Sequence, residues 1–173
     1  MPRLITASAF LIFALSLLPG MFGANLGELE GMIPAPRDGY GAFGGGGSKE
    51  SLKWVKNDLP AAIEQAKREN KLVFVNFTGY TCTNCHWMKA NMFTQSDVIA
   101  AMKEFVLVEL YTDDPNEAVA EKNQKLQDER YRTVAVPYYV ILDTSEKVRG
   151  AFPSATRDKS EWLKFLAGAR ASS

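Results

Sequence analysis

Two cysteines, Cys82 and Cys85, stand three residues apart and are the only cysteines in the chain. A disulfide between them would close almost no loop, so it would restrict the unfolded chain very little. Secreted domains that depend on disulfides for stability use more cysteines at longer spacings. A helix that begins at Cys82 would favour ionisation of that thiol through its free N–H groups and its dipole. The pair therefore predicts disulfide exchange, in which Cys82 attacks a substrate disulfide and Cys85 resolves the mixed disulfide.

The residue after Cys85 is His86, so the motif also matches C-x-x-C-H, the attachment sequence of c-type haem. Against haem, the motif directly follows a buried-strand pattern, and two methionines that could serve as the second axial ligand, Met88 and Met92, fall in the same predicted helix. A structural zinc site usually takes four Cys or His ligands, and His86 is the only histidine. We expect neither a metal nor a cofactor beyond the Cys82–Cys85 disulfide. A c-type haem protein and a non-catalytic interaction module remain as alternatives.

The elements around the motif predict a compact α/β domain over residues 51–173. Asp58, followed by a proline in the first turn, is typical of a helix N-terminus. Residues 72–77 form a short apolar run rich in β-branched side chains, as in a buried central strand. The order of elements predicts a mixed sheet with helices on both faces. The expected helices cover 59–70, 82–93, 96–104, 115–131 and 158–169, and the expected strands cover 72–77, 105–111, 138–142 and 148–152.

The N-terminal segment 4–22 carries no charge and is long enough to span a bilayer core of roughly 30 Å. Arg3 precedes it, while Glu28 and Glu30 follow, which favours an orientation with the N-terminus inside. We expect residues 1–23 to be a transmembrane anchor, with a cleaved signal peptide as the alternative. Both interpretations place the remainder of the chain outside the cytoplasm.

Residues 24–50 are rich in glycine and proline and have neither a helical nor a strand period. Such composition predicts a flexible linker between anchor and domain. Lys+Arg and Asp+Glu balance at 20 each, so no global field favours a nucleic-acid partner. A hydrophobic content of 46% excludes a disordered chain.

The residues 77–89, FTGYTCTNCHWMK, with Val136-Pro137 downstream, resemble the C-terminal thioredoxin-like domain of the DsbD family of thiol:disulfide interchange and cytochrome c biogenesis proteins. The resemblance covers about residues 52–170, and segment 4–22 is similar to the membrane helix that leads into that domain. It implies a thioredoxin-like fold and a reductase that takes electrons from a membrane-embedded thiol carrier. It also implies that Pro137 is cis, packs beside the cysteines and lines the substrate groove.

Two positions depart from the pattern of that family. An aspartate is usual six residues before the first cysteine, where this chain has Asn76, and a glutamate is usual seven residues after it, where this chain has Lys89. A carboxylate at either position can raise the pKa of the thiols and move protons, which neither Asn76 nor a charged Lys89 can do. His86 and Tyr80 are further candidate modulators, since His86 lies four residues after Cys82 and can stabilise a thiolate when charged.

The sequence thus predicts an enzyme, a protein-disulfide reductase on the periplasmic or outer face of the cytoplasmic membrane, anchored through residues 4–22. Its expected partners are protein disulfides of extracytoplasmic substrates and the membrane thiol carrier. The direction of electron flow depends on the relative stability of the two redox forms.

Overall fold

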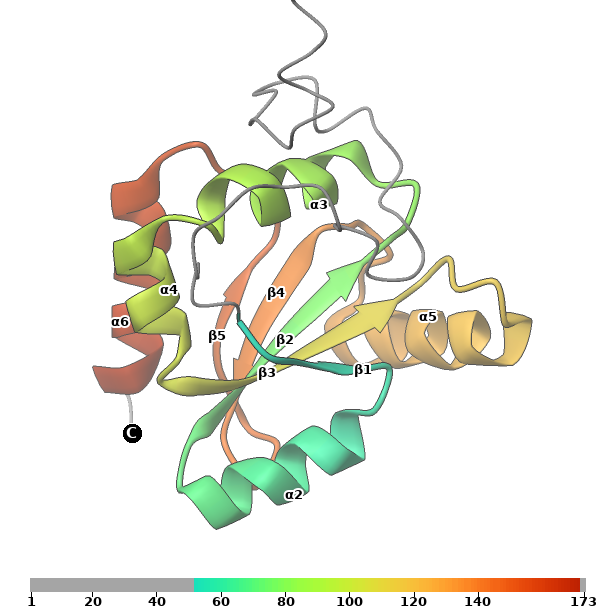
Figure 1. The fold of residues 1–173 in the computed structure, drawn as a ribbon. Helices are drawn as coiled ribbons and strands as arrows, with labels where there is room; N and C mark the ends of the chain where they lie inside the picture. Colours follow the sequence, from blue (N-terminus) through green and yellow to red (C-terminus); the bar gives the residue numbers. More distant parts are fainter. Residues whose placement is uncertain (1–51, 172–173) are drawn as a thin grey trace, which may run out of the picture.

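The computed structural model describes residues 52–171. Five strands form one sheet in the order β1-β3-β2-β4-β5 (Figure 1). The strands are β1 (Trp54–Lys56), β2 (Leu72–Thr78), β3 (Phe105–Tyr111), β4 (Tyr138–Leu142) and β5 (Val148–Phe152). The helices are α2 (Leu59–Glu69), α3 (Thr83–Trp87), α4 (Ser96–Met102), α5 (Glu117–Tyr131) and α6 (Lys159–Ala171), and a π-helical turn, η2 (Met88–Met92), directly follows α3.

The sheet is mixed, as the sequence predicts. β1 and β2 both run parallel to β3, whereas β4 is antiparallel to β2 and β5 is antiparallel to β4. The expected elements are confirmed to within a few residues at their ends, apart from the helix over 82–93. β1 has no counterpart among the sequence predictions, because its three residues become a strand only by pairing with Leu107–Glu109 of β3.

Helices cover both faces of the sheet, as expected (Figure 1). α2 and α5 lie on one face, where Ile63 of α2 packs with Val75 and Val108 in one apolar cluster. α3, η2, α4 and α6 lie on the other face, where Trp162 of α6 packs edge-on against Phe74 with ring centroids 5.9 Å apart. β2 is therefore buried on both faces, and the short loop 79–82 leads from its end to α3.

The helical segment after the cysteines differs from the single helix predicted over 82–93. α3 lasts only five residues, and the chain then widens into η2, where the N–H of Phe93 donates to the carbonyl of Met88. Met88 and Met92 point into the core and are fully buried. They are therefore packing residues of the apolar cluster.

Within residues 52–171, none of the helices is long and apolar enough to cross a membrane. The expected anchor over 1–23 and the expected linker over 24–50 lie outside the described residues.

Candidate active site

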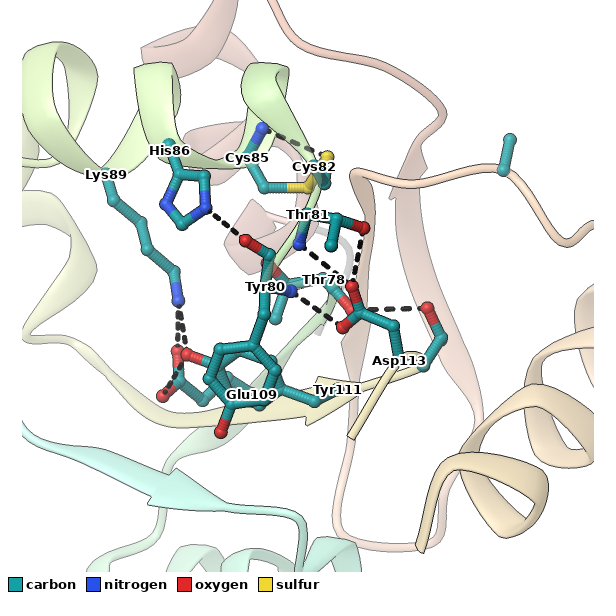
Figure 2. Close-up of a disulfide and its surroundings, with 12 residues drawn as sticks. Thr78, Tyr80, Thr81, Cys82, Cys85, His86, Lys89, Glu109, Tyr111 and Asp113 are labelled. Atoms are coloured by element: carbon teal, nitrogen blue, oxygen red, sulfur yellow. Dashed lines mark hydrogen bonds and ion pairs between the residues drawn. A yellow bond between two sulfur atoms is a disulfide. The ribbon is translucent and has the colours of Figure 1, made fainter. Parts of the chain in front are cut away.

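The two cysteines form a disulfide at the start of α3 (Figure 2). Cys82 is the N-cap residue of α3, and its sulfur accepts a hydrogen bond from the backbone N–H of Cys85 at 3.2 Å. A backbone N–H of the first helical turn, that of Cys85, thus points toward the Cys82 sulfur. Such groups favour a negative charge at that position, which is the condition for a reactive thiol.

The two sulfurs differ in their access to solvent. Cys82 is partly exposed, whereas Cys85 is only 2% exposed. A protein partner approaching α3 reaches Cys82 first. This asymmetry matches the predicted roles, in which Cys82 attacks and Cys85 resolves.

Asp113, on the loop between β3 and α5, holds the segment that leads into Cys82 (Figure 2). Its carboxylate accepts hydrogen bonds from the backbone N–H of Tyr80 at 2.6 Å, the backbone N–H of Thr81 at 2.9 Å and the hydroxyl of Thr81 at 2.8 Å. A Cβ on Gly79 would lie 3.0 Å from the nearer carboxylate oxygen, so any larger residue there would push the Asp113 side chain away. Asp113 was not among the candidates from the sequence.

Burial raises the pKa of the Asp113 carboxyl. The hydrogen bonds from the N–H groups of Thr81 and Tyr80 and from the Thr81 hydroxyl lower that pKa by more than burial raises it, so the pKa lies below its ordinary value. A depressed carboxyl pKa means that the folded state favours the ionised form. Its contribution to stability is therefore present above the ordinary carboxyl pKa of about 3.9 and is lost as the pH falls through the lower folded value.

Asp113→Asn tests this arrangement. We expect the variant to lose about 1–2 kcal/mol of unfolding free energy at pH 7. The amide NH2 group of asparagine would replace one of the two accepting oxygens and face N–H or O–H groups of Tyr80 and Thr81, and the negative charge would be lost. The difference should narrow as the pH falls below about 4, where the wild type also loses its carboxylate charge. Denaturant titrations over this pH range measure it, with the exposed Asp128→Asn as a control expected within about 0.5 kcal/mol of wild type. A difference that is constant with pH would contradict the role of the charge.

His86 bonds to the same segment from the helix. Its Nε2 lies 2.7 Å from the carbonyl oxygen of Tyr80, and since a carbonyl only accepts, Nε2 carries the proton and donates. From the sequence, His86 was a candidate to stabilise the Cys82 thiolate. The structure instead places its ring in a contact that ties α3 to the loop before Cys82 (Figure 2).

Tyr80 also packs against the sheet. Its ring stacks on Tyr111 of β3 with centroids 4.1 Å apart, and the ammonium of Lys56 lies 5.3 Å from the centroid of the Tyr80 ring. Asp113, His86 and Tyr111 thus hold the loop at Tyr80 from three directions, which fixes the position of Cys82.

Lys89 does not present an unpaired charge to the disulfide. Its ammonium forms an ion pair with Glu109 at 2.6 Å and donates to the hydroxyl of Tyr111 at 2.9 Å (Figure 2). Positions 76 and 89 carry no carboxylate, but β3 supplies one nearby in Glu109. The sequence gives no local signal for Glu109, since the pairing depends on the position of β3 beneath the helix.

Asn76 is 1% exposed and lies on β2 beside Glu109 in the parallel ladder. Within the described part of the chain, its Oδ1 and the Oγ1 of Thr78 are buried without a hydrogen-bond partner. Both residues lie on the sheet face that carries Phe74, which α3 and η2 cover. The interior below the helix thus holds two unsatisfied acceptors.

The Val136–Pro137 peptide bond is cis, as the resemblance implies. It immediately precedes β4, the strand next to β2 in the sheet. Residues 52–171 contain no cluster of three or more His, Cys, Asp or Glu side chains able to hold a metal ion.

Comparison with known proteins agrees with this geometry. At the level of fold, the chain is similar to a DsbH oxidoreductase (22% identity, TM-score 0.57, covering 69% of this chain and 84% of that one). It is also similar to a thioredoxin from Thermus thermophilus (26%, 0.55, 68% and 85%) and to the reduced C-terminal domain of Neisseria meningitidis DsbD (19%, 0.56, 67% and 100%). A search of curated proteins gave no match. A family model described as thioredoxin-like matches residues 53–144, which is more than half of the sequence, and the chain therefore belongs to this thioredoxin-like family.

Proposed function

We propose that the protein is a protein-disulfide reductase that acts outside the cytoplasm. The observation that carries the proposal is the Cys82–Cys85 disulfide at the start of α3, with one sulfur accessible and the other shielded. Three separate contacts hold the loop before Cys82 in place, which is what a reacting group requires.

The reaction starts from the dithiol. The Cys82 thiolate attacks a substrate disulfide, forms a mixed disulfide and releases the first substrate thiolate, which takes up a proton. Cys85 then loses its proton and attacks the Cys82 sulfur, which breaks the mixed disulfide and releases the second substrate thiol. Two electrons pass to the substrate, and Cys82–Cys85 becomes the disulfide seen here. A donor dithiol must reduce it again for the next cycle.

The proposed donor is a thiol carrier embedded in the cytoplasmic membrane, and residues 4–22 are the proposed anchor that keeps the domain beside it. The resemblance of residues 77–89 to the DsbD family and the fold-level similarity to a DsbD C-terminal domain support this assignment. Pro137, at the start of β4, is the proposed wall of the substrate groove.

Equilibration with glutathione tests the direction of electron flow. A reductase requires a reduction potential for Cys82–Cys85 at or below about −230 mV, in the range of thioredoxin, whereas the strong oxidant DsbA lies near −120 mV. The redox state of the two cysteines, read by alkylation and mass spectrometry across a glutathione series, gives the value. A potential near that of DsbA would overturn the assignment as a reductase and favour an oxidase.

Haem attachment is the alternative that the C-x-x-C-H motif raises. We expect protein produced with a complete cytochrome maturation system to show no Soret absorption and no covalent haem mass, because His86 already bonds to the loop at Tyr80. The methionines of the helix, Met88 and Met92, are fully buried in the core and do not reach a surface site. Stoichiometric covalent haem would establish the alternative.

A further inference from the structure

The Lys89–Glu109 ion pair lies near the disulfide (Figure 2), and the proposed reaction does not use it. The two side chains are 30% and 13% exposed, so the pair is largely shielded from water. Tyr111 bonds to both partners, because its hydroxyl accepts from Lys89 at 2.9 Å and donates to Glu109 at 3.2 Å. Glu109 is the only carboxylate within the five strands of the described chain.

The pair lies below the helix that carries the cysteines. Lys89 follows Cys85 by four residues, about one helical turn, so both side chains leave the same side of the helical segment. Glu109 is the ladder neighbour of Asn76, and the two side chains share the sheet face that α3 and η2 cover. Figure 2 shows Lys89 reaching from the helical segment toward Glu109 and Tyr111.

The charge of this pair bears on the ionisation of the thiols. A cation near a thiol favours the thiolate, and an anion disfavours it. Shielding from water strengthens both effects. Because the two charges are opposite and lie close together, their effects on the ionisation of the thiols nearly cancel. Other titratable or charged side chains also lie around α3 and the loop before it: Lys56 of β1, Tyr80 of the β2–α3 loop, His86 of α3, Tyr111 of β3, Asp113 of the β3–α5 loop and Arg157 of the β5–α6 loop, whose guanidinium lies 5.2 Å from the centroid of the Trp87 ring.

We propose that Glu109 is a positioning residue for the dithiol: it holds and neutralises Lys89, so that the reduced cysteines are not over-stabilised as thiolates. This inference rests on the proposed function and deepens it. A reduced form stabilised by an unbalanced cation would hold its electrons more tightly and raise the reduction potential. The balanced pair keeps the dithiol a good electron donor.

Removing one charge of the pair should then shift the alkylation rate and the reduction potential in a direction that depends on which charge is removed. Glu109→Gln leaves Lys89 unbalanced, so the alkylation rate of the reduced protein at pH 7 should rise at least about threefold and the potential should become less negative. Lys89→Met leaves Glu109 unbalanced, so the rate should fall at least about threefold and the potential should become more negative. The double variant should return to within about twofold of wild type.

The matched control is the Arg149–Asp143 pair of the β4–β5 hairpin, which has similar exposures of 24% and 14% and an N–O distance of 3.0 Å. Arg149→Met should leave alkylation and potential unchanged. If Glu109→Gln does not fold, as judged by near-UV circular dichroism, Lys89→Met against the charge-conserving Lys89→Arg carries the same test. Lys89→Arg should keep wild-type values.

Shifts in the same direction for both single variants, or no shift in either, would overturn the inference while a reducing wild-type potential leaves the proposed function standing. A wild-type dithiol that does not exchange with glutathione would instead remove the proposed function. The wild-type protein thus tests the proposed function, and the Glu109 and Lys89 variants test the inference, in the same experiment.

Discussion

A Cys85→Ser variant is expected to accumulate stable mixed disulfides with its protein partners through Cys82. The partly exposed Cys82 can still attack a substrate disulfide, but the buried thiol that releases the product is gone. An intramolecular attack by a well-placed group has an effective molarity of about 10⁵ M or more. Losing it should lengthen the lifetime of the mixed disulfide by at least about 10³-fold over the intact protein. Non-reducing gels and mass spectrometry of extracts that express the variant would detect the adducts.

Cys82→Ser is the matched control, because it keeps the same helix and removes the accessible thiol. It should form no adducts and should lose reductase activity, and the double variant should behave in the same way. Equal trapping by both single variants, or trapping by Cys82→Ser alone, would contradict the assignment of the nucleophile. Reductase activity retained without Cys82 would remove the proposed mechanism altogether.

The fold was largely predictable because local patterns agree with the tertiary structure. The strands 105–111 and 138–142 were expected with the bounds that β3 and β4 have, since buried apolar runs allow few alternatives. The start of α2 was equally clear, and the Asp58 carboxylate does accept from the N–H of Ala61 at 2.9 Å. β1 could not be predicted in this way. Three residues carry no usable period, and only the ladder to β3 makes them a strand.

The sequence predicts a candidate site residue only where its residue type and its neighbours in the chain together indicate its role. Cys82 and Cys85 were predicted because their residue types and the strand pattern before them identify them, and Pro137 was predicted from the resemblance to the DsbD family. Asp113 and Glu109 were missed, since their contacts join residues far apart in the chain. Tyr80 and Asp113 are 33 residues apart, and Lys89 and Glu109 are 20 apart. Such contacts depend on which residues two strands place side by side, and no local pattern encodes that.

Asn76→Asp is expected to destabilise the folded protein strongly at neutral pH. The side chain at this position is 1% exposed and lies beside Glu109 in the ladder. Burial should raise the folded-state pKa of the introduced carboxyl above its unfolded value of about 3.9. The folded state then retains a proton that the unfolded state releases. Stability is therefore lost as the pH rises above about 4, by about 1.4 kcal/mol per pH unit until the folded pKa is reached.

For a folded pKa near 7, typical of a buried carboxyl, the loss at pH 7 is about 4 kcal/mol, while the variant remains close to wild type near pH 4. Denaturant titrations between pH 4 and pH 8 measure this profile. Asn116→Asp provides the matched control, because Asn116 is exposed at the N-cap of α5 and accepts from the N–H of Ala118, which a carboxylate does equally well. If Asn76→Asp and wild type lose stability in parallel over this range, the folded state does not raise the pKa of a carboxyl at position 76, and the prediction is wrong.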